Sequence, residues 1–185
     1  MVNKGSALFA LLATVGSVAA YPTQDKVTQL WQWTDISWGL YSGYADIPGT
    51  SKSLHYVAAL SQQNKTTDPV IVWFNGGPGC SSMLGFLQEH GPYSLADGET
   101  SFSKNPYSWN KEANVIYIES PAGVGYSVCG KKEECQWNDF NTADDNLQAF
   151  LGIMNKFPEL QAKDLYIAGE SYAGIYVPRL VERID

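Results

Sequence analysis

Residues 164–174 (DLYIAGESYAG) decide the fold of this chain, because they place a serine at a turn between a strand and a helix. The run before Gly169 is short, apolar and β-prone, and residues 175–181 (IYVPRLV) are able to continue as a helix. Ser171 in such a turn has the layout of a nucleophile elbow, whose helix N-terminus favours developing negative charge. Because Ala173 replaces the second glycine of the strict G-x-S-x-G pattern, the stretch alone fits an ordinary polar turn equally well.

Strands further up the chain indicate an α/β sheet. Residues 39–46 and 54–60 are predicted to form a hairpin around the turn-rich segment 47–50. Residues 69–74 (PVIVWF) and 114–118 (NVIYI) are continuous apolar runs, as expected for strands buried on both faces, and the strand before the elbow is a third such run. Buried strands that alternate with helices predict the α/β fold class, with right-handed crossovers, in one domain.

A helix is predicted between the second buried strand and the elbow. Its apolar positions share one face at helical spacing, and they are Ala143, Leu147, Phe150, Leu151 and Met154. We expect Asn141 or Thr142 to cap its start and Pro158 to end it.

The size and charge of the chain narrow its function classes. At 185 residues, with 44% hydrophobic and 17% charged side chains, it is long enough for one globular domain with a sizeable core. Its formal net charge of -7 argues against nucleic acid and anionic membranes as partners. Two isolated histidines argue against a zinc site, and we expect no metal and no cofactor.

Residues 1–20 have the pattern of a secretory signal peptide. Lys4 supplies the positive start, residues 7–15 (ALFALLATV) the apolar core, and residues 18–20 (VAA) the small side chains before the cleavage point. The apolar run is too short for a stable membrane span. We therefore expect residues 21–185 to be the folded part and the secretory pathway to be the destination.

Because the secretory pathway is oxidising, the three cysteines are candidates for disulfide bonds. Cys129 and Cys135 flank a charged loop and are candidates for a local disulfide, which leaves Cys80 free or without a partner in this chain. Asn64 begins the one N-glycosylation sequon, which lies in a polar loop.

A glycine-rich loop, residues 75–82 (NGGPGCSS), follows the first buried strand. Ligands of open α/β sheets bind beyond the carboxyl ends of strands, where this loop is expected. The adjacent Gly76 and Gly77 leave backbone N–H groups open to a ligand, which suits an oxyanion hole. A phosphate loop is disfavoured, because the Walker lysine and the G-x-G-x-x-G spacing are both missing. By itself the segment also fits an ordinary glycine-rich turn.

Taken together, these stretches resemble the serine carboxypeptidases. The matching motifs follow the family's order through nearly the whole mature chain, and they are residues 73–82 (WFNGGPGCSS), 89–93 (EHGPY), 105–109 (NPYSW), 119–127 (ESPAGVGYS) and 169–178 (GESYAGIYVP). The resemblance implies an α/β-hydrolase-like fold, with a mixed, mostly parallel sheet flanked by helices and truncated after the elbow. It also implies a serine-type carboxypeptidase that removes C-terminal residues from peptides and proteins.

The resemblance assigns roles to individual residues. Ser171 would be the nucleophile that forms an acyl-enzyme, and the backbone N–H groups of Gly77 and Tyr172 would form the oxyanion hole. Four residues would hold the substrate's C-terminal carboxylate and so restrict cleavage to the last peptide bond: Asn75, Gly76, Glu170 and Glu89.

Glu89 would pair with Glu170 in this arrangement. Two carboxyl groups in contact do not readily both ionise, so one of them keeps its proton to higher pH. A protonated Glu170 donates a hydrogen bond to a substrate carboxylate, whereas an ionised one repels it. We therefore expect cleavage of peptides to be best in acid.

The chain differs from the family in lacking the residues that would act as the base for the nucleophile. The family supplies an aspartate and a histidine far downstream, in the order Ser…Asp…His, whereas this sequence stops at Asp185. Neither histidine of the chain matches the family's base. His55 is expected as a surface or half-buried side chain on an edge strand, and His90 as a structural hydrogen-bonding group.

The same departure predicts the N-terminal portion of a longer secreted, vacuolar or lysosomal carboxypeptidase, inactive by itself. Cys80 would then pair with a cysteine of the missing half, and the strand before Ser171 would be a sheet edge. Two alternatives are an acyltransferase or esterase on the same scaffold and a non-catalytic truncated binding protein. A carboxylate clamp has no evident use on a neutral ester, which favours the peptidase, whereas the missing histidine favours the binding protein.

Overall fold

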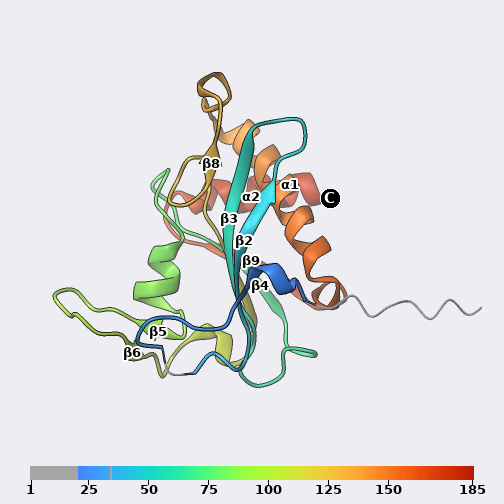
Figure 1. Ribbon diagram of the computed structural model, residues 1–185. Helices are drawn as coiled ribbons and strands as arrows, with labels where there is room; N and C mark the ends of the chain where they lie inside the picture. The colour runs from blue at the N-terminus through green and yellow to red at the C-terminus, as the bar shows by residue number, and fades with distance from the viewer. Residues whose placement is uncertain (1–20, 34) are drawn as a thin grey trace, which may run out of the picture.

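The computed structural model describes residues 21–33 and 35–185, so the predicted signal peptide lies outside the described residues. A seven-stranded mixed sheet forms its centre, in the order β1-β2-β3-β7-β4-β9, with β8 also pairing with β3 (Figure 1). The strands are β1 (Lys26–Val27), β2 (Leu40–Asp46), β3 (Lys52–Ala59), β4 (Val70–Phe74), β7 (Asn114–Ile118), β8 (Val128–Cys129) and β9 (Leu165–Gly169). These bounds confirm the predicted hairpin, both apolar strands and the strand that enters the elbow.

The parallel part of the sheet brings together the loops singled out in the sequence. β4 pairs in parallel with β7 on one side and with β9 on the other. The carboxyl ends of these three strands therefore meet at one edge, and the segments that leave them are residues 75–82, 119–127 and 170–172. The α/β fold class predicted from the sequence is confirmed.

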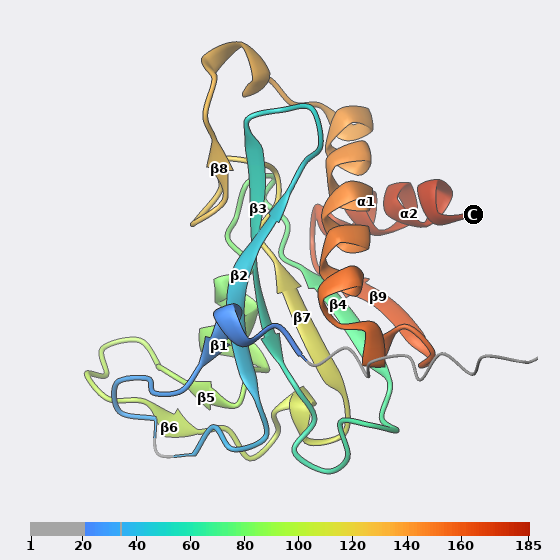
Figure 2. The ribbon, with the colours of Figure 1, turned by 45° about the vertical axis from the view of Figure 1, so that its right-hand side comes forward.

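The two faces of the sheet carry different coverings. The helices α1 (Asp139–Lys156) and α2 (Ala173–Ile184) lie on one face, as Figure 2 shows. A short π-helical turn, η2 (Gly85–Glu89), and the hairpin of β5 (Tyr93–Ser94) with β6 (Ser103–Lys104) lie on the other. The remaining short helices are η1 (Thr23–Asp25), η3 (Trp109–Lys111), η4 (Lys132–Glu134) and η5 (Pro158–Leu160). Within the part of the chain that the structure describes, no helix has the length and apolar character needed to cross a membrane.

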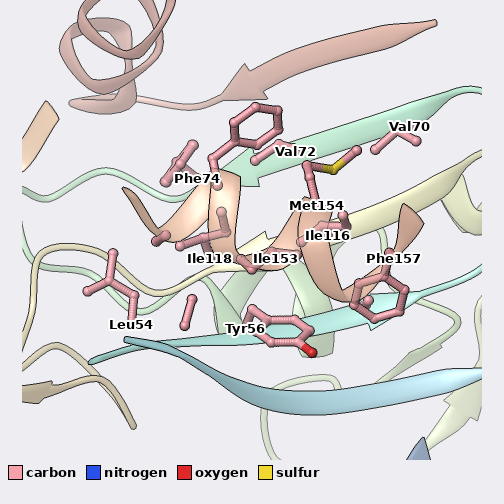
Figure 3. Packing of buried hydrophobic residues seen from close by; sticks show 14 of the residues in the cluster. Leu54, Tyr56, Val70, Val72, Phe74, Ile116, Ile118, Ile153, Met154 and Phe157 are labelled. Carbon is pink, nitrogen blue, oxygen red and sulfur yellow. The ribbon is translucent and has the colours of Figure 1, made fainter. Parts of the chain in front are cut away.

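Alternating side chains divide the core between the two faces. On β7, Ile116 and Ile118 pack into the cluster under α1 and α2, whereas Val115 and Tyr117 pack into the cluster on the opposite face. This period of two is the pleat of a strand that is covered on both sides. Figure 3 shows the helix-side cluster, in which Ile153 of α1 lies against the sheet.

The start of α1 differs from the prediction. Asn138 caps the helix, because its Oδ1 accepts hydrogen bonds from the backbone N–H groups of Phe140 and Asn141. In turn, the backbone N–H of Asn138 donates a hydrogen bond to Asn141 Oδ1 at 2.7 Å. This reciprocal capping box explains why the predicted caps, Asn141 and Thr142, lie inside the helix instead.

The buried face of α1 agrees with the predicted one except at Leu151, which is 46% exposed. Ala143, Phe150 and Met154 are buried, and Leu147 packs against the helix-side cluster. The same face includes two buried polar residues, Asp145 and Asn146, whose side chains bond to Lys52 and Ser120.

β9 lies at the edge of the described sheet, as the sequence predicts, and it is less buried than the other two apolar strands. Leu165 is 38% exposed and Tyr166 is 57% exposed. Its prediction as a third strand buried on both faces is therefore wrong for this structure, because only β4 pairs with it.

Candidate active site

The elbow is built by a backbone conformation that side chains rarely adopt. Ser171 has φ 55°, and strain of this kind costs about 1–3 kcal/mol, so surrounding contacts must impose it. A Cβ on Gly169 would lie 2.5 Å from both Ala173 Cβ and the carbonyl oxygen of Phe74, so only glycine fits between β4 and α2. The result is an exposed serine side chain at the point where β9 ends and α2 begins.

The glycine-rich loop lies directly against this elbow. A Cβ on Gly76 would come within 2.4 Å of Tyr172 N and 3.0 Å of Ser171 Cβ. Gly77 has φ 108°, and Cys80 N donates to Gly76 O at 3.0 Å, which folds the loop back on itself. Among the described residues, no acceptor takes a hydrogen bond from the N–H of Gly77 or Tyr172. Two backbone donors are thus open beside the serine.

A buried amide joins the two carboxylates predicted to act together. Asn75 Nδ2 donates to Glu170 Oε1 at 2.9 Å and to Glu89 Oε1 at 3.2 Å. Its Oδ1 accepts from Trp73 Nε1 at 2.8 Å and from Gly85 N at 3.1 Å. Because both of those partners are donors, the orientation of the amide is determined, and its NH₂ group must face the carboxylates.

Within this cluster, the carboxyl group of Glu89 has a shifted pKa. Burial raises the pKa of the Glu89 carboxyl, the charge of Glu170 raises it further, and the bond from Asn75 opposes both. The geometry therefore places two carboxyl groups near an exposed serine, and the pKa of one of them, Glu89, is raised.

A side-chain hydrogen bond to Asp139, which the sequence did not predict, holds Tyr172. Its hydroxyl donates to Asp139 Oδ1 at 2.8 Å, and this hydrogen bond raises the pKa of the phenol. Asp139 is the first residue of α1, so the residue after the serine is tied to a second helix. Asp139 lies at the start of α1, where an acidic residue is expected for the helix alone, so nothing in the sequence indicated that it bonds to Tyr172.

His55 differs from its prediction as a surface or half-buried residue on an edge strand. It is 5% exposed, because β3 lies between β2 and β7 and is not an edge. Its two ring nitrogens lie 2.9 Å from Ser42 Oγ and 2.9 Å from Glu119 Oε2. Glu119 itself is fully buried, and its place inside a family motif was the only signal that could have marked it.

His90 lies in an aromatic setting. Its Nδ1 is 3.1 Å from the Tyr117 hydroxyl, and its ring stacks on Trp109 with centroids 4.0 Å apart. Burial lowers the pKa of His90 to about 4. The chain has two histidines, and neither makes a hydrogen bond to Ser171 among the described residues.

The remaining predicted residues lie apart from the serine. Cys129 and Cys135 form the predicted disulfide, and Cys80 is free and exposed. Asn64 is exposed in the loop from β3 to β4, at the end of β4 opposite to Ser171, and its Oδ1 accepts from Thr66 Oγ1 at 2.6 Å. No group of three metal-ligating side chains occurs among the described residues.

Comparison with known proteins identifies the family. The sequence profile of the serine carboxypeptidases matches residues 32–185. The chain belongs to this family. It is 42% identical over 180 residues to a serine carboxypeptidase of Caenorhabditis elegans and 42% identical over 174 residues to the lysosomal protective protein of Mus musculus. These alignments cover 97% and 94% of this chain but 38% and 36% of the relatives, so the chain spans little more than a third of their length.

A solved structure supports the fold as well. The prohormone-processing carboxypeptidase Kex1 of Saccharomyces cerevisiae superposes with a TM-score of 0.66 and 27% sequence identity. The match covers 79% of this chain and 34% of the yeast chain. The α/β-hydrolase-like fold of this serine carboxypeptidase region is therefore shown by sequence and by structure.

Proposed function

We propose that this chain carries the nucleophile and the carboxylate-recognition elements of a serine-type carboxypeptidase. The observation that carries the proposal is the contact between Gly76 and the elbow, which sets the open N–H groups of Gly77 and Tyr172 beside Ser171. Donors in that place suit the oxyanion of a tetrahedral intermediate. Ser171 then attacks the last peptide carbonyl and forms an acyl-enzyme, which water hydrolyses.

The Asn75 cluster restricts this reaction to C-termini. A peptide carboxylate is held by the Asn75 amide, the Gly76 N–H and a protonated acid of the Glu89–Glu170 pair. Because an ionised pair repels an anionic substrate, binding is strongest in acid and weakens as the second proton leaves. Substrates are peptide and protein C-termini, and no metal or cofactor takes part.

The base that activates Ser171 comes from residues outside this chain in this proposal. Both histidines are hydrogen-bonded elsewhere, and the curated relatives are more than twice as long. A serine without its base keeps only the contribution of binding and of the oxyanion hole, so the chain alone is inactive. Residues 1–20 direct the protein into the secretory pathway, for secretion or for a vacuolar or lysosomal compartment, with Asn64 as a glycan site.

One observation favours a second candidate, a protein that binds peptide C-termini without cleaving them. The Asn75–Glu89–Glu170 cluster and the open N–H groups suit a bound peptide carboxylate, while neither histidine bonds to Ser171 within the part of the chain that the structure describes. An esterase or acyltransferase on this scaffold has less support, since a neutral ester offers the clamp nothing to hold.

Intact mass spectrometry of the natural protein, after treatment with a fluorophosphonate, tests these proposals. A mass well above that of this chain, with an adduct at Ser171, supports the full-length peptidase. A mass that corresponds to residues 21–185, with no adduct at Ser171, contradicts the peptidase and supports the binding protein.

A further inference from the structure

A second chain of hydrogen bonds links a serine, a histidine and an acid away from Ser171. His55 Nε2 lies 2.9 Å from Ser42 Oγ, and His55 Nδ1 lies 2.9 Å from Glu119 Oε2. The side chain of Glu119 is 0% exposed and that of His55 is 7% exposed. One imidazole thus connects a buried carboxylate to a serine hydroxyl.

The chemistry of Glu119 sets the direction of these bonds. Its burial raises the pKa of the carboxyl, but hydrogen bonds from His55, Ser81 and the N–H of Tyr126 outweigh burial and lower that pKa overall. An ionised carboxylate only accepts, so His55 Nδ1 carries the hydrogen. In the neutral ring Nε2 is then an acceptor, and the Ser42 hydroxyl donates to it. This polarity is that of a serine nucleophile with its base and an orienting acid.

Ser42 and His55 also line a pocket of about 470 Å³. Its apolar lining side chains are Val27, Leu30, Leu40, Val57, Met83 and Phe86. Tyr126, which also lines it, is 67% exposed, so the pocket reaches the surface. Its lining residues Leu40, Val57 and Phe86 belong to the core cluster on the face of the sheet opposite to α1 and α2.

The pocket is separate from the elbow. Ser42 is on β2 and Ser171 follows β9, with β3, β7 and β4 between these strands. At the usual strand spacing, four ladders correspond to roughly 19 Å. His55 therefore serves Ser42 and not Ser171.

We propose that Ser42, His55 and Glu119 form a second nucleophilic site, which takes neutral esters of small apolar acyl groups. The apolar walls of the pocket favour a neutral acyl chain. Asp25 also lines the pocket, but its carboxylate is paired with Lys156 Nζ at 2.8 Å.

The reaction at this site has two steps. Ser42 Oγ forms a bond to the ester carbonyl carbon, the ester C–O bond breaks, and the serine proton passes through His55 Nε2 to the leaving alkoxide. Water then attacks the acyl-serine, His55 takes the proton of the water, and Ser42 regains a proton as the acid leaves. Glu119 keeps the ring in the required tautomer and remains ionised throughout.

Labelling of the full natural protein with a fluorophosphonate, followed by peptide mapping, tests the site. In a Ser171→Ala background we expect a Ser42 adduct, and His55→Gln slows its formation at least roughly tenfold, since general bases typically contribute 10²–10⁴-fold. Ser53, on the adjacent strand, is the internal control because its hydroxyl bonds to Asp46 and to no histidine. We expect it to stay unlabelled.

Hydrolysis of p-nitrophenyl butyrate gives a second readout. Ser171→Ala removes the hydrolysis that occurs at the elbow, and we expect the hydrolysis that remains to be abolished when Ser42→Ala is added. Absence of a Ser42 adduct in the folded protein overturns the proposal, and so does equal labelling of Ser42 and Ser53. Should His55→Gln fail to fold, labelling before and after urea denaturation decides: loss of the Ser42 adduct in urea supports the site, and unchanged labelling refutes it.

Discussion

Two clusters of polar side chains lie near the carboxyl ends of the parallel strands, and each contains a carboxyl group whose pKa is shifted, in opposite directions. In the Asn75 cluster, Glu89 and Glu170 share one amide, and burial together with the neighbouring charge raises the pKa of Glu89. In the His55 cluster, Glu119 is more deeply buried, yet three donors lower the pKa of its carboxyl. The comparison teaches that the supply of donors, more than the depth of burial, decides which carboxyl keeps its proton.

The opposite shifts have opposite consequences for stability. Glu119 has a lowered pKa when folded, so its contribution is present above the unfolded pKa and is lost as pH falls through the folded value. Glu89 has a raised pKa, so its contribution is present below the unfolded pKa and is lost as pH rises through the folded value. The Asn75 cluster is therefore suited to a change of protonation, and the His55 cluster to holding a fixed negative charge.

Glu119→Gln tests the second cluster with the largest expected effect. The change removes the ionised acceptor of the hydrogen bonds from His55 and Ser81. Because a hydrogen bond to a charged group is worth about 1.5–3 kcal/mol, we expect a loss of about 3–5 kcal/mol of unfolding free energy. Urea unfolding at pH 7 measures it. The matched control is Glu182→Gln, whose surface pair with Arg179 is worth about 1 kcal/mol or less.

The same pair of proteins checks the sign of the pH dependence. The stability difference between wild type and Glu119→Gln shrinks as pH falls, because the wild-type carboxylate becomes protonated. A difference that is constant from neutral to acid pH, or one no larger than that of the control, would show that Glu119 is not the fixed charge described here.

Asn75→Ala has the next largest effect, in the first cluster. It leaves the buried donors Trp73 Nε1 and Gly85 N without an acceptor, at a cost of about 1–3 kcal/mol. It also removes the bond that opposes the raised pKa of Glu89, which therefore rises further. Carboxyl NMR titration with urea unfolding measures both effects. A fall in the pKa of Glu89 would contradict the role given to the amide.

Glu170→Gln distinguishes the effect of the Glu170 charge from that of its hydrogen bond on the binding of a peptide carboxylate. This prediction rests on the proposed peptidase activity. In the wild-type full-length protein we expect KM for a peptide to rise roughly tenfold between pH 5 and pH 7, since one pKa unit of differential binding is tenfold. The variant carries a permanent neutral donor, so its KM changes about twofold or less over this range. If the variant keeps the steep wild-type loss of affinity, the shared proton is not the cause.

Glu89→Gln has the smallest expected effect on stability. The amide mimics the protonated acid, so at pH 7 the variant is equal to or more stable than wild type. The gain is about 1 kcal/mol or less, because the residue as a whole is exposed although its carboxyl is partly buried. This small gain disappears in acid, where the wild-type carboxyl is itself protonated. Urea unfolding at two pH values checks the result, and a clear destabilisation at pH 7 would contradict the raised pKa.

Much of the fold could be predicted because its signals are local. The apolar runs at 69–74 and 114–118 became β4 and β7, the hairpin formed where turn residues separate two β-prone runs, and Cys129 found Cys135 six residues away. The glycine loop and the elbow were also identified, because tight approaches require residues without side chains.

Predictions that depended on the neighbour of an element were less successful. His55 was expected near an edge, but its strand lies inside the sheet, and no pattern within residues 52–59 reports which strands flank them. The face of α1 followed from spacing except at Leu151, but spacing gave no sign that Asp145 and Asn146 are buried and bond to Lys52 and Ser120. Glu119 gave no composition or spacing signal at all.

The sequence by itself determined the strands, the turn at Ser171 and the local disulfide, because each depends on the conformational preferences of consecutive residues. The family followed from the resemblance of its motifs. Only the tertiary structure decided that Gly76 presses against Tyr172, that Asn75 bridges Glu89 and Glu170, and that His55 links Glu119 to Ser42. The bond between Asn75 and Glu170 alone joins positions 95 residues apart. The energies of these contacts depend on burial and on donor geometry, which exist only after the strands have aligned.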